Sequence, residues 1–278
     1  MSIIILGSNG FVASSLKNYL KKKKQFFYSL GKKDINFLKE TSTKIFKNFL
    51  RNKKNYTIII TAAIAPAKNL QNYTDNIIMI KNIINSIDLK KLKKIIYISS
   101  DAVYTDTKKK ITEKSVTNPT SIHGLMHLHR ETLLKNFFDK KLLIIRPTLL
   151  YGKYDTHNGY GPNQFMRNLI KNKRIYLFGK GEERRDHLYV FDLVKIISLA
   201  IEKNISGVLN AVTSKVISFH KLANLAKQIT NKGLKIKYLK RKGPMHHLGL
   251  RRFDNSKIYS NFKNFEFSDL NDNLKKFL

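Results

Sequence analysis

The sequence contains no cysteine and no tryptophan, and it has only five proline residues. Without cysteine the chain cannot form disulfide bonds or bind a metal through thiolates, which fits a cytoplasmic protein. No apolar run approaches the roughly 20 residues that a membrane-spanning helix requires. The sequence also starts with the apolar residues 3–6, so a secretory signal peptide is not expected.

Acidic side chains are scarce as well. Asp and Glu number 19 against 53 Lys and Arg, which gives a formal net charge of +34. Such an excess can attract nucleic acid, anionic lipid or a phosphorylated substrate. The lysines, however, are scattered in short runs, and Lys, Asn and Ile are abundant together, as AT-rich coding produces. No nucleic-acid-binding motif accompanies them, so we expect no specific nucleic-acid partner and no membrane span.

The first half of the chain alternates short Ile-rich runs with longer amphipathic stretches. Five runs of continuous apolar character predict strands buried on both faces, at residues 3–6, 26–30, 57–61, 95–99 and 142–146. Residues 11–22, 73–87 and 121–138 read as helices between them. Alternation at this spacing predicts an α/β fold, a doubly wound parallel sheet of the Rossmann type.

The pattern changes after residue 152. A loop at residues 155–163 is followed by shorter strand and helix patterns, including a strand at 175–179 and helices at 190–202 and 218–230. We expect a Rossmann domain over residues 1–152 and a small α+β substrate domain over residues 153–278. Part of the segment 186–215 is expected to return to the Rossmann sheet.

The turn after the first strand predicts a phosphate-binding loop. Two glycines frame Gly7-Ser8-Asn9-Gly10, and the next helix begins with Phe11 and Val12. Glycine lets the backbone approach a pyrophosphate, whose charge then faces the amides of the helix N-terminus. A glycine pattern alone is weak, but this one lies between the first strand and the first helix of an alternating chain.

The end of the second strand favours NADP over NAD. NAD sites usually place an acidic residue here, whereas this chain offers Ser29 and then Lys32 and Lys33 before Asp34. A hydroxyl with nearby cations suits a 2′-phosphate. Ala62 and Ala63, after the third strand, complete the expected cofactor contacts.

The segment Ser99-Ser100-Asp101-Ala102-Val103-Tyr104 resembles the fourth-strand motif of extended short-chain dehydrogenases, the NAD-dependent epimerase/dehydratase family that acts on nucleotide-sugars. Further similar segments follow in family order along nearly the whole chain, at Asn76, Arg146-Pro147, Tyr151-Gly152, residues 185–190, 210–213 and 253–257. The resemblance implies a nucleotide-sugar or related phosphorylated sugar as substrate, and a possible homodimer.

By this resemblance Ser100 holds the reacting sugar oxygen, and Asn76 belongs to the cofactor site. Asp101, Arg184, Arg185 and Arg252 are candidate substrate contacts, since a guanidinium meets phosphate oxygens with paired donors. Only one acidic residue stands at 101–102, where the family's dehydratases place two. Dehydration is therefore disfavoured against epimerisation or keto-sugar reduction.

The sequence departs from the family at its Tyr-x-x-x-Lys signature, where His123 and His127 stand instead. Tyrosine, with a pKa of about 10, needs help from lysine to act near neutral pH, whereas histidine, at roughly 6.5, does not. Residues four apart on a helix share a face. We therefore expect His123 as the acid/base and His127 as a catalytic-site and ribose contact.

Two other readings of the histidines stay open at this point. Both positions could have lost their roles, leaving a protein that binds a nucleotide or nucleotide-sugar without hydride chemistry. A metal site over His123, His127 and His129 lacks the Glu of a His-Glu-x-x-His motif and a third ligand on the same face, so no metal is expected.

Overall fold

A computed structural model describes residues 2–233 and 235–278. The chain forms two compact units, each discontinuous in sequence. Unit 1 comprises residues 1–105, 115–147 and 194–209, and unit 2 comprises residues 106–114, 148–193 and 210–278. The expected division assigned residues 1–152 to one domain and residues 153–278 mainly to the other, with part of 186–215 returning to the Rossmann sheet. In the two units, residues 106–114 also belong to unit 2, and residues 194–209 belong to unit 1.

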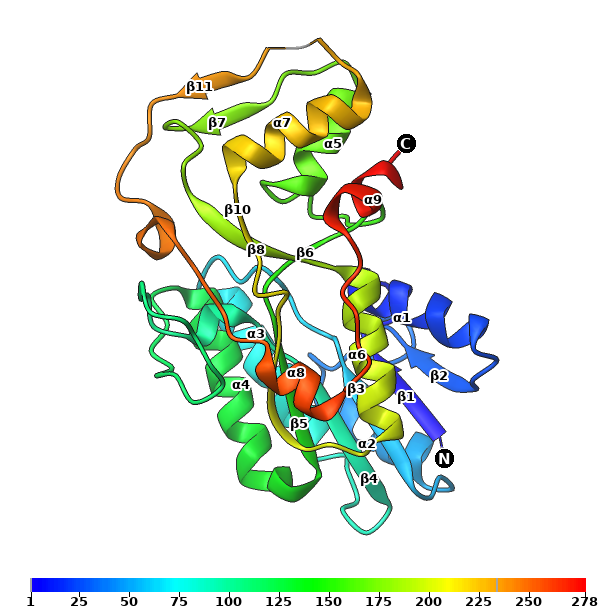
Figure 1. Cartoon of the computed structure of the whole chain (residues 1–278). Helices are drawn as coiled ribbons and strands as arrows, with labels where there is room; N and C mark the ends of the chain where they lie inside the picture. Colours follow the sequence, from blue (N-terminus) through cyan, green and yellow to red (C-terminus); the bar gives the residue numbers. More distant parts are fainter. Residues whose placement is uncertain (1, 234) are drawn as a thin grey trace. The chain divides into compact units, whose positions relative to one another are not determined.

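Strands and helices alternate from the start (Figure 1). The strands are β1 (Ser2–Leu6), β2 (Phe27–Leu30), β3 (Tyr56–Ile60), β4 (Leu92–Ile98), β5 (Leu142–Pro147), β6 (Leu149–Tyr151), β7 (Tyr176–Phe178), β8 (Arg184–Tyr189), β9 (Gly207–Ala211), β10 (Val216–Ser218) and β11 (Lys237–Leu239). The helices are α1 (Phe11–Lys22), α2 (Thr41–Leu50), α3 (Leu70–Ile84), α4 (Ile122–Phe138), α5 (Pro162–Ile170), α6 (Val190–Glu202), α7 (Phe219–Thr230), α8 (Ser256–Asn261) and α9 (Leu270–Lys275), with short 3-10 turns η1 (Asp101–Val103), η2 (Asp139–Lys141) and η3 (His246–Gly249).

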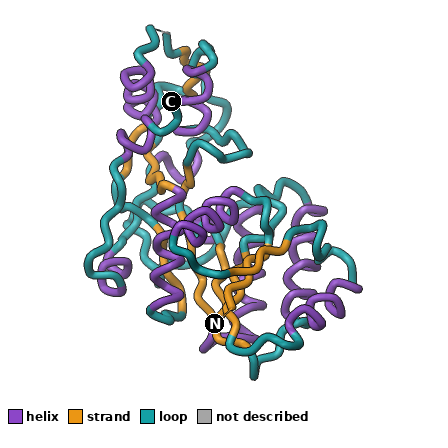
Figure 2. The backbone as a smooth tube through the Cα atoms, turned by 90° about the vertical axis from the view of Figure 1, so that its right-hand side faces the viewer, coloured by secondary structure: helices purple, strands orange, loops and turns teal. Residues whose placement is uncertain are grey.

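Unit 1 is built on a six-stranded sheet of order β2-β1-β3-β4-β5-β9. Strands β1 to β5 pair in parallel, with Ile3 opposite Phe27 on one side and Thr57 on the other. The tube view in Figure 2 shows these strands side by side among helices. The predicted doubly wound Rossmann sheet is confirmed, and the strand that returns from the 186–215 segment is β9 at its edge.

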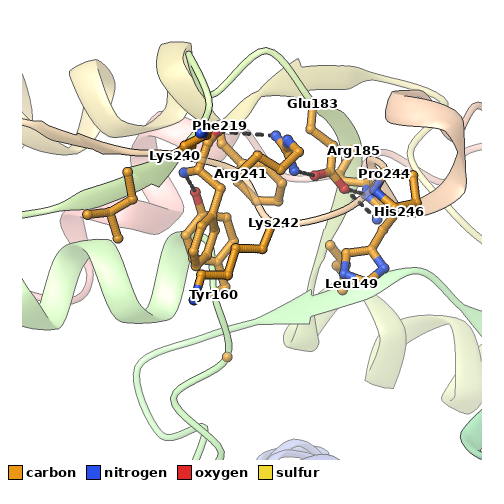
Figure 3. Close-up of a pocket in the computed structure, with 13 residues that line it drawn as sticks. Leu149, Tyr160, Glu183, Arg185, Phe219, Lys240, Arg241, Lys242, Pro244 and His246 are labelled. Carbon is orange, nitrogen blue, oxygen red and sulfur yellow. Dashed lines mark hydrogen bonds and ion pairs between the residues drawn. The ribbon is translucent and has the colours of Figure 1, made fainter.

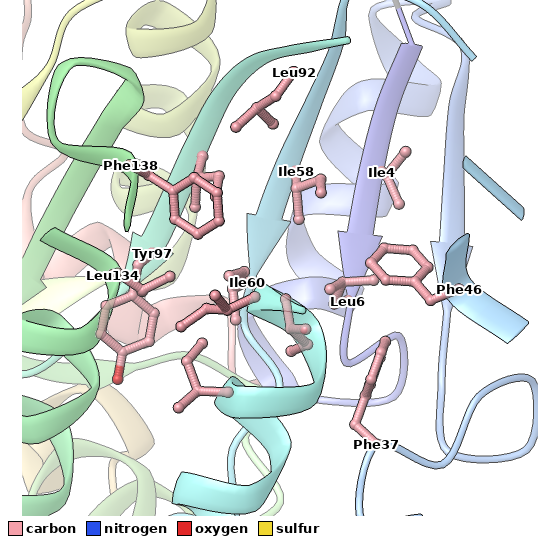
Figure 4. Close-up of a cluster of buried hydrophobic side chains, with 14 of the residues drawn as sticks. Ile4, Leu6, Phe37, Phe46, Ile58, Ile60, Leu92, Tyr97, Leu134 and Phe138 are labelled. Atoms are coloured by element: carbon pink, nitrogen blue, oxygen red, sulfur yellow. The ribbon is translucent and has the colours of Figure 1, made fainter. Parts of the chain in front are cut away.

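The order of the strands reverses between β1 and β3. Because parallel crossovers are right-handed, α1 lies on one face of the sheet, and α2, α3 and α4 lie on the other. Buried residues of those three helices, such as Phe46, Ile80 and Leu134, pack on Ile4, Ile58 and other sheet residues (Figure 4). The reversal leaves a crevice at the carboxyl ends of β1 and β3, where ligands of such sheets bind.

Unit 2 contains two small sheets. One has the order β10-β8-β6, with β8 parallel to β6 and antiparallel to β10, and the other pairs β7 with β11 in parallel. Helices α5 and α7 pack together through apolar side chains such as Phe165 and Phe219. The Ser218 hydroxyl caps α7 by accepting from the Lys221 N–H, and Asn231 ends it in the left-handed conformation.

Candidate active site

A cavity of about 250 Å³ lies at the switch point between β1 and β3. It is lined by Gly7, Ser8, Asn9, Gly10, Leu30, Gly31, Lys32, Ile35, Phe37, Thr61, Ala62, Ala63, Ile64 and Met79. Gly7 to Gly10, Lys32, Ala62 and Ala63 are cofactor contacts predicted from the sequence. Ile35 and Phe37 were not predicted, and they form an apolar wall after β2. The alternation of these two apolar residues around Asn36 was the only feature of the sequence that could have indicated this wall.

The backbone at the glycine turn fits a pyrophosphate. Gly7 has φ +98°, and a Cβ there would lie 2.7 Å from the Ala62 nitrogen, so glycine is required. Gly10 caps α1 with no side-chain hydrogen bond, and no acidic residue occupies the first turn. The amides that open α1, from Phe11 and Val12 onward, therefore keep the donor capacity that an anion needs.

The end of β2 is arranged differently from the prediction. The Asp34 carboxylate accepts a hydrogen bond of 2.7 Å from the Gly31 N–H, so it stabilises the turn itself. Lys32 lines the cavity, but Ser29 is not among the lining residues. Side chains alternate along a strand, and Ser29 lies next to the cavity-lining Leu30, with its hydroxyl buried and without a hydrogen-bond partner.

Asn76 is fully buried in α3, and its side-chain amide forms hydrogen bonds with backbone groups. Its Oδ1 accepts from the Ile64 N–H at 3.0 Å, while its Nδ2 donates to the carbonyls of Ile64 and Asn72. Asn76 therefore positions the segment after β3, whose residue Ile64 lines the cavity.

Helix α4 carries the two signature histidines. The Ser121 hydroxyl caps the helix by accepting from the Gly124 N–H. A Cβ on Gly124 would lie 2.1 Å from the carbonyl oxygen of Ala102, so only glycine allows α4 to approach η1 this closely. The rings of His123 and His127 meet edge to face with centroids 4.7 Å apart, which confirms that they share a face.

His123 is half-buried, and its Nδ1 accepts a long hydrogen bond of 3.4 Å from the Ala67 N–H. Burial lowers the pKa of His123, and the negative charge of Asp101 opposes this only in part. His123 is thus neutral near pH 7. With Nδ1 facing a donor, its proton lies on Nε2.

His127 is buried, with 4% of its surface exposed, and its Nδ1 lies 2.6 Å from the Tyr97 hydroxyl. Burial raises the pKa of Tyr97, so the phenol keeps its proton, and we assign it as the donor. The pKa of His127 lies well below its usual range because of burial and the charges of His123 and Arg130. His127 is a neutral ring anchored to β4.

Arg130 is a buried cation that the sequence analysis overlooked. Its Nη2 donates to the Ala62 carbonyl at 2.8 Å, and its Nη1 donates to Asn76 Oδ1 at 3.3 Å. The guanidinium also lies 5.0 Å from the centre of the Tyr97 ring. The family resemblance expects lysine at position 127. In this protein a positive charge, that of Arg130, lies about one helical turn beyond that position.

A second buried group fixes α4 to the sheet. Glu131 accepts two hydrogen bonds from Arg146 on β5, at 2.9 and 2.5 Å, and one of 2.6 Å from the Ser99 hydroxyl after β4. Ser100, the predicted sugar contact, is partly exposed and caps η1, since its hydroxyl accepts from the Ala102 N–H at 3.1 Å. Asp101 begins η1 beside it.

Unit 2 has its own cavity, of about 770 Å³ (Figure 3). Tyr160, Phe178 and Phe219 supply aromatic walls. Arg185 donates from Nε and Nη2 to Glu183 Oε1, at 3.0 and 2.7 Å, and Arg241 approaches the other oxygen of Glu183. The cavity thus contains a shared carboxylate between two guanidinium groups, with Lys240 and Lys242 adding positive charge.

The other predicted substrate contacts lie outside this cavity. Arg184 is exposed on β8, and Arg252 is exposed and donates to the Lys108 carbonyl. The neighbouring Arg251 is buried and pairs with Asp106 at 3.1 Å. Arg241 lines the unit 2 cavity, and this was not predicted. In a chain with so many basic residues, a single arginine cannot be recognised from the sequence as a site residue.

Within residues 2–233 and 235–278 no cluster of three His, Asp or Glu side chains could hold a metal ion. His129 instead contacts the Tyr73 hydroxyl at 2.6 Å through Nδ1. Over the same residues, no helix has the length and apolar character needed to cross a membrane.

Comparison with known proteins supports the resemblance seen in the sequence. Residues 3–212, most of the chain, match the family described as the NAD-dependent epimerase/dehydratase family. The chain belongs to this family. The family's dependence on NAD agrees with the nicotinamide dinucleotide expected from the glycine turn.

Two individual relatives are similar to this chain at less than 30% sequence identity. The dTDP-D-glucose 4,6-dehydratase of Dictyostelium discoideum is 28% identical over 270 residues, covering 82% of this chain and 61% of that protein. The N-acetyl-alpha-D-glucosaminyl-diphospho-ditrans,octacis-undecaprenol 4-epimerase of Escherichia coli O157:H7 is 26% identical over 189 residues, covering 66% of this chain and 55% of that protein. The chain therefore spans less than two thirds of the length of either relative.

Among solved structures, the UDP-glucose 4-epimerase of Thermotoga maritima with UDP-glucose has a TM-score of 0.84 at 20% identity. The match covers 99% of this chain and 96% of that one. This likeness shows that the two chains share their fold.

Proposed function

We propose that the protein binds a nicotinamide dinucleotide in the cavity at the glycine turn of unit 1. The single observation that carries this proposal is the turn itself, with Gly7 at φ +98° and an α1 N-terminus free of side-chain caps. Gly7 to Gly10 and the first amides of α1 would hold the pyrophosphate. Ile35 and Phe37 offer an apolar wall for the adenine.

We propose NADP rather than NAD at this site. Lys32 lines the cavity and can meet a 2′-phosphate. The acidic residue available nearby, Asp34, is bonded to the Gly31 amide rather than left for a ribose hydroxyl. This arrangement supports the preference drawn from the sequence, although it no longer includes Ser29.

We propose as substrate a sugar linked through a diphosphate, and the cavity of unit 2 offers groups that can bind a diphosphate. The Thermotoga enzyme was solved with UDP-glucose, and the name of the Escherichia coli relative contains a sugar-diphospho-polyprenol. Arg185 and Arg241 can exchange their bonds to Glu183 for bonds to phosphate oxygens, which accept paired guanidinium donors. The aromatic walls offer stacking for a base or contact for an apolar group.

The reaction that we propose is epimerisation or keto-sugar reduction. When bound, the dinucleotide would supply or accept the hydride at the sugar carbon. On the protein side, Ser100 can hold the oxygen of that carbon, and His123 Nε2 can donate to it. For His123 to take a proton, the proton on Nε2 must first pass to Nδ1, and this breaks the long contact with Ala67.

The same contact favours a second candidate function, binding of a nucleotide or nucleotide-sugar without hydride chemistry. His123 rests as a neutral donor, and His127 is anchored to Tyr97, so neither ring is set up as a free base. The two candidates share the dinucleotide site and differ only in turnover.

Binding is tested by native mass spectrometry and calorimetry with NADPH and NADH. Gly10 has room for a side chain, with only the Gly7 oxygen within 4 Å, at 3.4 Å. The Gly10→Val variant should therefore fold. Its side chain should keep the pyrophosphate from approaching the glycine turn and weaken dinucleotide binding about tenfold or more. Gly233 meets nothing within 4 Å, so Gly233→Val is the matched control. If neither dinucleotide binds the wild type, the proposal is wrong.

Turnover is tested with a panel of nucleotide-sugars and keto-sugars. His123→Ala should lower kcat about 100-fold or more while dinucleotide binding persists. His129, on the same helix but bonded to Tyr73, provides the control His129→Ala, which should change kcat less than about twofold. Dinucleotide binding without any turnover by the wild type would favour the second candidate.

A further inference from the structure

Two segments of unit 2 have no acidic residue. Residues 162–181 carry five cations, namely Arg167, Lys171, Lys173, Arg174 and Lys180. Residues 231–242 carry six, namely Lys232, Lys235, Lys237, Lys240, Arg241 and Lys242. The segments are distant in sequence, but the parallel pairing of β7 with β11 brings them side by side (Figure 1).

The register of this pair places apolar side chains on one face. Tyr176 lies opposite Lys237, and Phe178 lies opposite Leu239. Leu177, between the two aromatic residues, is fully buried, so Tyr176 and Phe178 lie on the other, outer face. We call the outer face formed by Tyr176, Phe178, Lys237 and Leu239 the β7–β11 face.

The β7–β11 face leaves large apolar side chains in solvent. Tyr176 is 45% exposed, Phe178 46% and Leu239 40%. Exposed cations flank the same strands in sequence, at Lys171, Lys173, Arg174, Lys235, Lys240 and Lys242. The scattered lysines of the sequence therefore include one group that flanks two exposed apolar strands.

We propose that the β7–β11 face docks on the surface of an anionic phospholipid bilayer. Lysines attract an anionic leaflet, and exposed aromatic and aliphatic side chains enter the headgroup region. The charge is complementary, because residues 162–181 and 231–242 carry eleven cations and no carboxylate, and the two carboxylates that follow directly, Glu182 and Glu183, both lie against Arg241. This proposal does not depend on the proposed redox chemistry.

A nucleic acid fits this face less well. Single strands stack their bases on aromatic side chains, and Leu239 offers no such surface. The guanidinium of Arg241 already contacts Glu182 and Glu183, so the cations left for a partner here are mainly lysines, compact charges that suit a fluid headgroup layer.

Docking would also bring a ligand site to the membrane. Phe178 and Leu239 belong both to the β7–β11 face and to the lining of the unit 2 cavity. The cavity and the docking surface therefore share side chains. A substrate whose diphosphate carries an apolar chain could enter from the bilayer through this opening.

The electrostatic part is tested by sedimentation of the full chain with phosphatidylcholine vesicles, with and without about 30% phosphatidylglycerol. The variant K173Q/R174Q/K235Q/K237Q removes four charges from outside the cavity lining. K21Q/K22Q/K23Q/K24Q removes four exposed charges from the end of α1 and serves as the control. We expect binding to anionic vesicles only, weakened about tenfold or more by the first variant and little by the second.

The apolar part is tested by fluorescence, because the chain has no tryptophan of its own. Tyr176→Trp should show a blue-shifted emission on anionic vesicles, whereas Tyr154→Trp, at a position that is 70% exposed outside the face, should not. Equal losses in the two lysine variants, equal shifts in both tryptophan variants, or tighter binding to single-stranded RNA than to vesicles would overturn the proposal. Dinucleotide binding, measured on the same samples, tests the proposed function separately.

Discussion

Arg130 donates a hydrogen bond of 2.8 Å to the carbonyl oxygen of Ala62, a residue that lines the cavity at the glycine turn of unit 1. Through this bond a buried cation on α4 holds the backbone that follows β3. The pKa of the neighbouring His127 is lowered partly by the same charge. Arg130 thus links the signature helix to the proposed cofactor site by a contact that the family signature alone does not include.

The first prediction concerns the position of this charge. His127→Lys should destabilise the protein, because it places a second buried cation beside Arg130. In the double variant with Arg130→Met the cost of the lysine should fall, giving a coupling free energy of about 1–3 kcal/mol. Urea unfolding of the four proteins measures it. If the losses in free energy of unfolding are additive, the charges at positions 127 and 130 do not interact.

The second prediction concerns His187, which is buried on β8. Burial, with the charge of Arg185, lowers its pKa from 6.5 to about 3. The unfolded chain therefore binds a proton below about pH 6.5 that the folded protein does not bind until about pH 3, so stability falls as pH falls between these values.

Replacement of this ring by phenylalanine should remove that pH dependence. As the pH falls from about 7.5 to about 5, the free energy of unfolding of His187→Phe should rise by about 2 kcal/mol relative to that of the wild type. His157 is exposed, so His157→Phe is the control and should show no such gain. Unfolding curves at the two pH values measure the difference, and an equal change in both variants would contradict the assignment.

The third prediction concerns the close approach of α4 to η1. Gly124→Ala places a Cβ about 2.1 Å from the Ala102 oxygen, so the helix must shift. We expect a loss of about 3 kcal/mol or more in the free energy of unfolding, together with loss of turnover, as overpacking against backbone produces. Gly233→Ala, in open space, should stay within about 0.5 kcal/mol of the wild type.

The fourth prediction concerns the buried ion pair of Glu131 and Arg146. Glu131→Ala leaves the Arg146 charge unpaired and should lower the free energy of unfolding by about 3–5 kcal/mol. Asp272 pairs with Lys275 on the surface at 3.1 Å, and Asp272→Ala should cost less than about 1 kcal/mol. Similar losses in the two variants would show that burial does not strengthen the pair.

The sheet was predictable because its strands are buried on both faces and therefore read as continuous Ile-rich runs. The glycine turn was predictable because backbone geometry there demands glycine. Ser29 and Asn76 illustrate the limit of such reasoning. Their residue types suit a cofactor contact, but strand alternation leaves Ser29 off the cavity lining, and the backbone of Ile64 uses the amide of Asn76.

Arg130 could not have been found from the sequence for a different reason. In a helix of a strongly basic chain, an arginine looks like a surface charge until tertiary structure shows its burial. The same holds for Arg241, whose role depends on Glu183, a carboxylate 58 residues earlier in the chain. Polar groups that act through long-range partners leave no periodic pattern along the chain.

The edge strand β9 has a consequence for the order in which the protein is made. The sixth strand of the sheet is β9, Gly207–Ala211, so β5 has no neighbour on that side until this strand has been synthesised. During that interval the apolar residues of β5 present an open backbone edge on the ribosome. Nascent chains therefore carry this unpaired edge until β9 emerges from the ribosome.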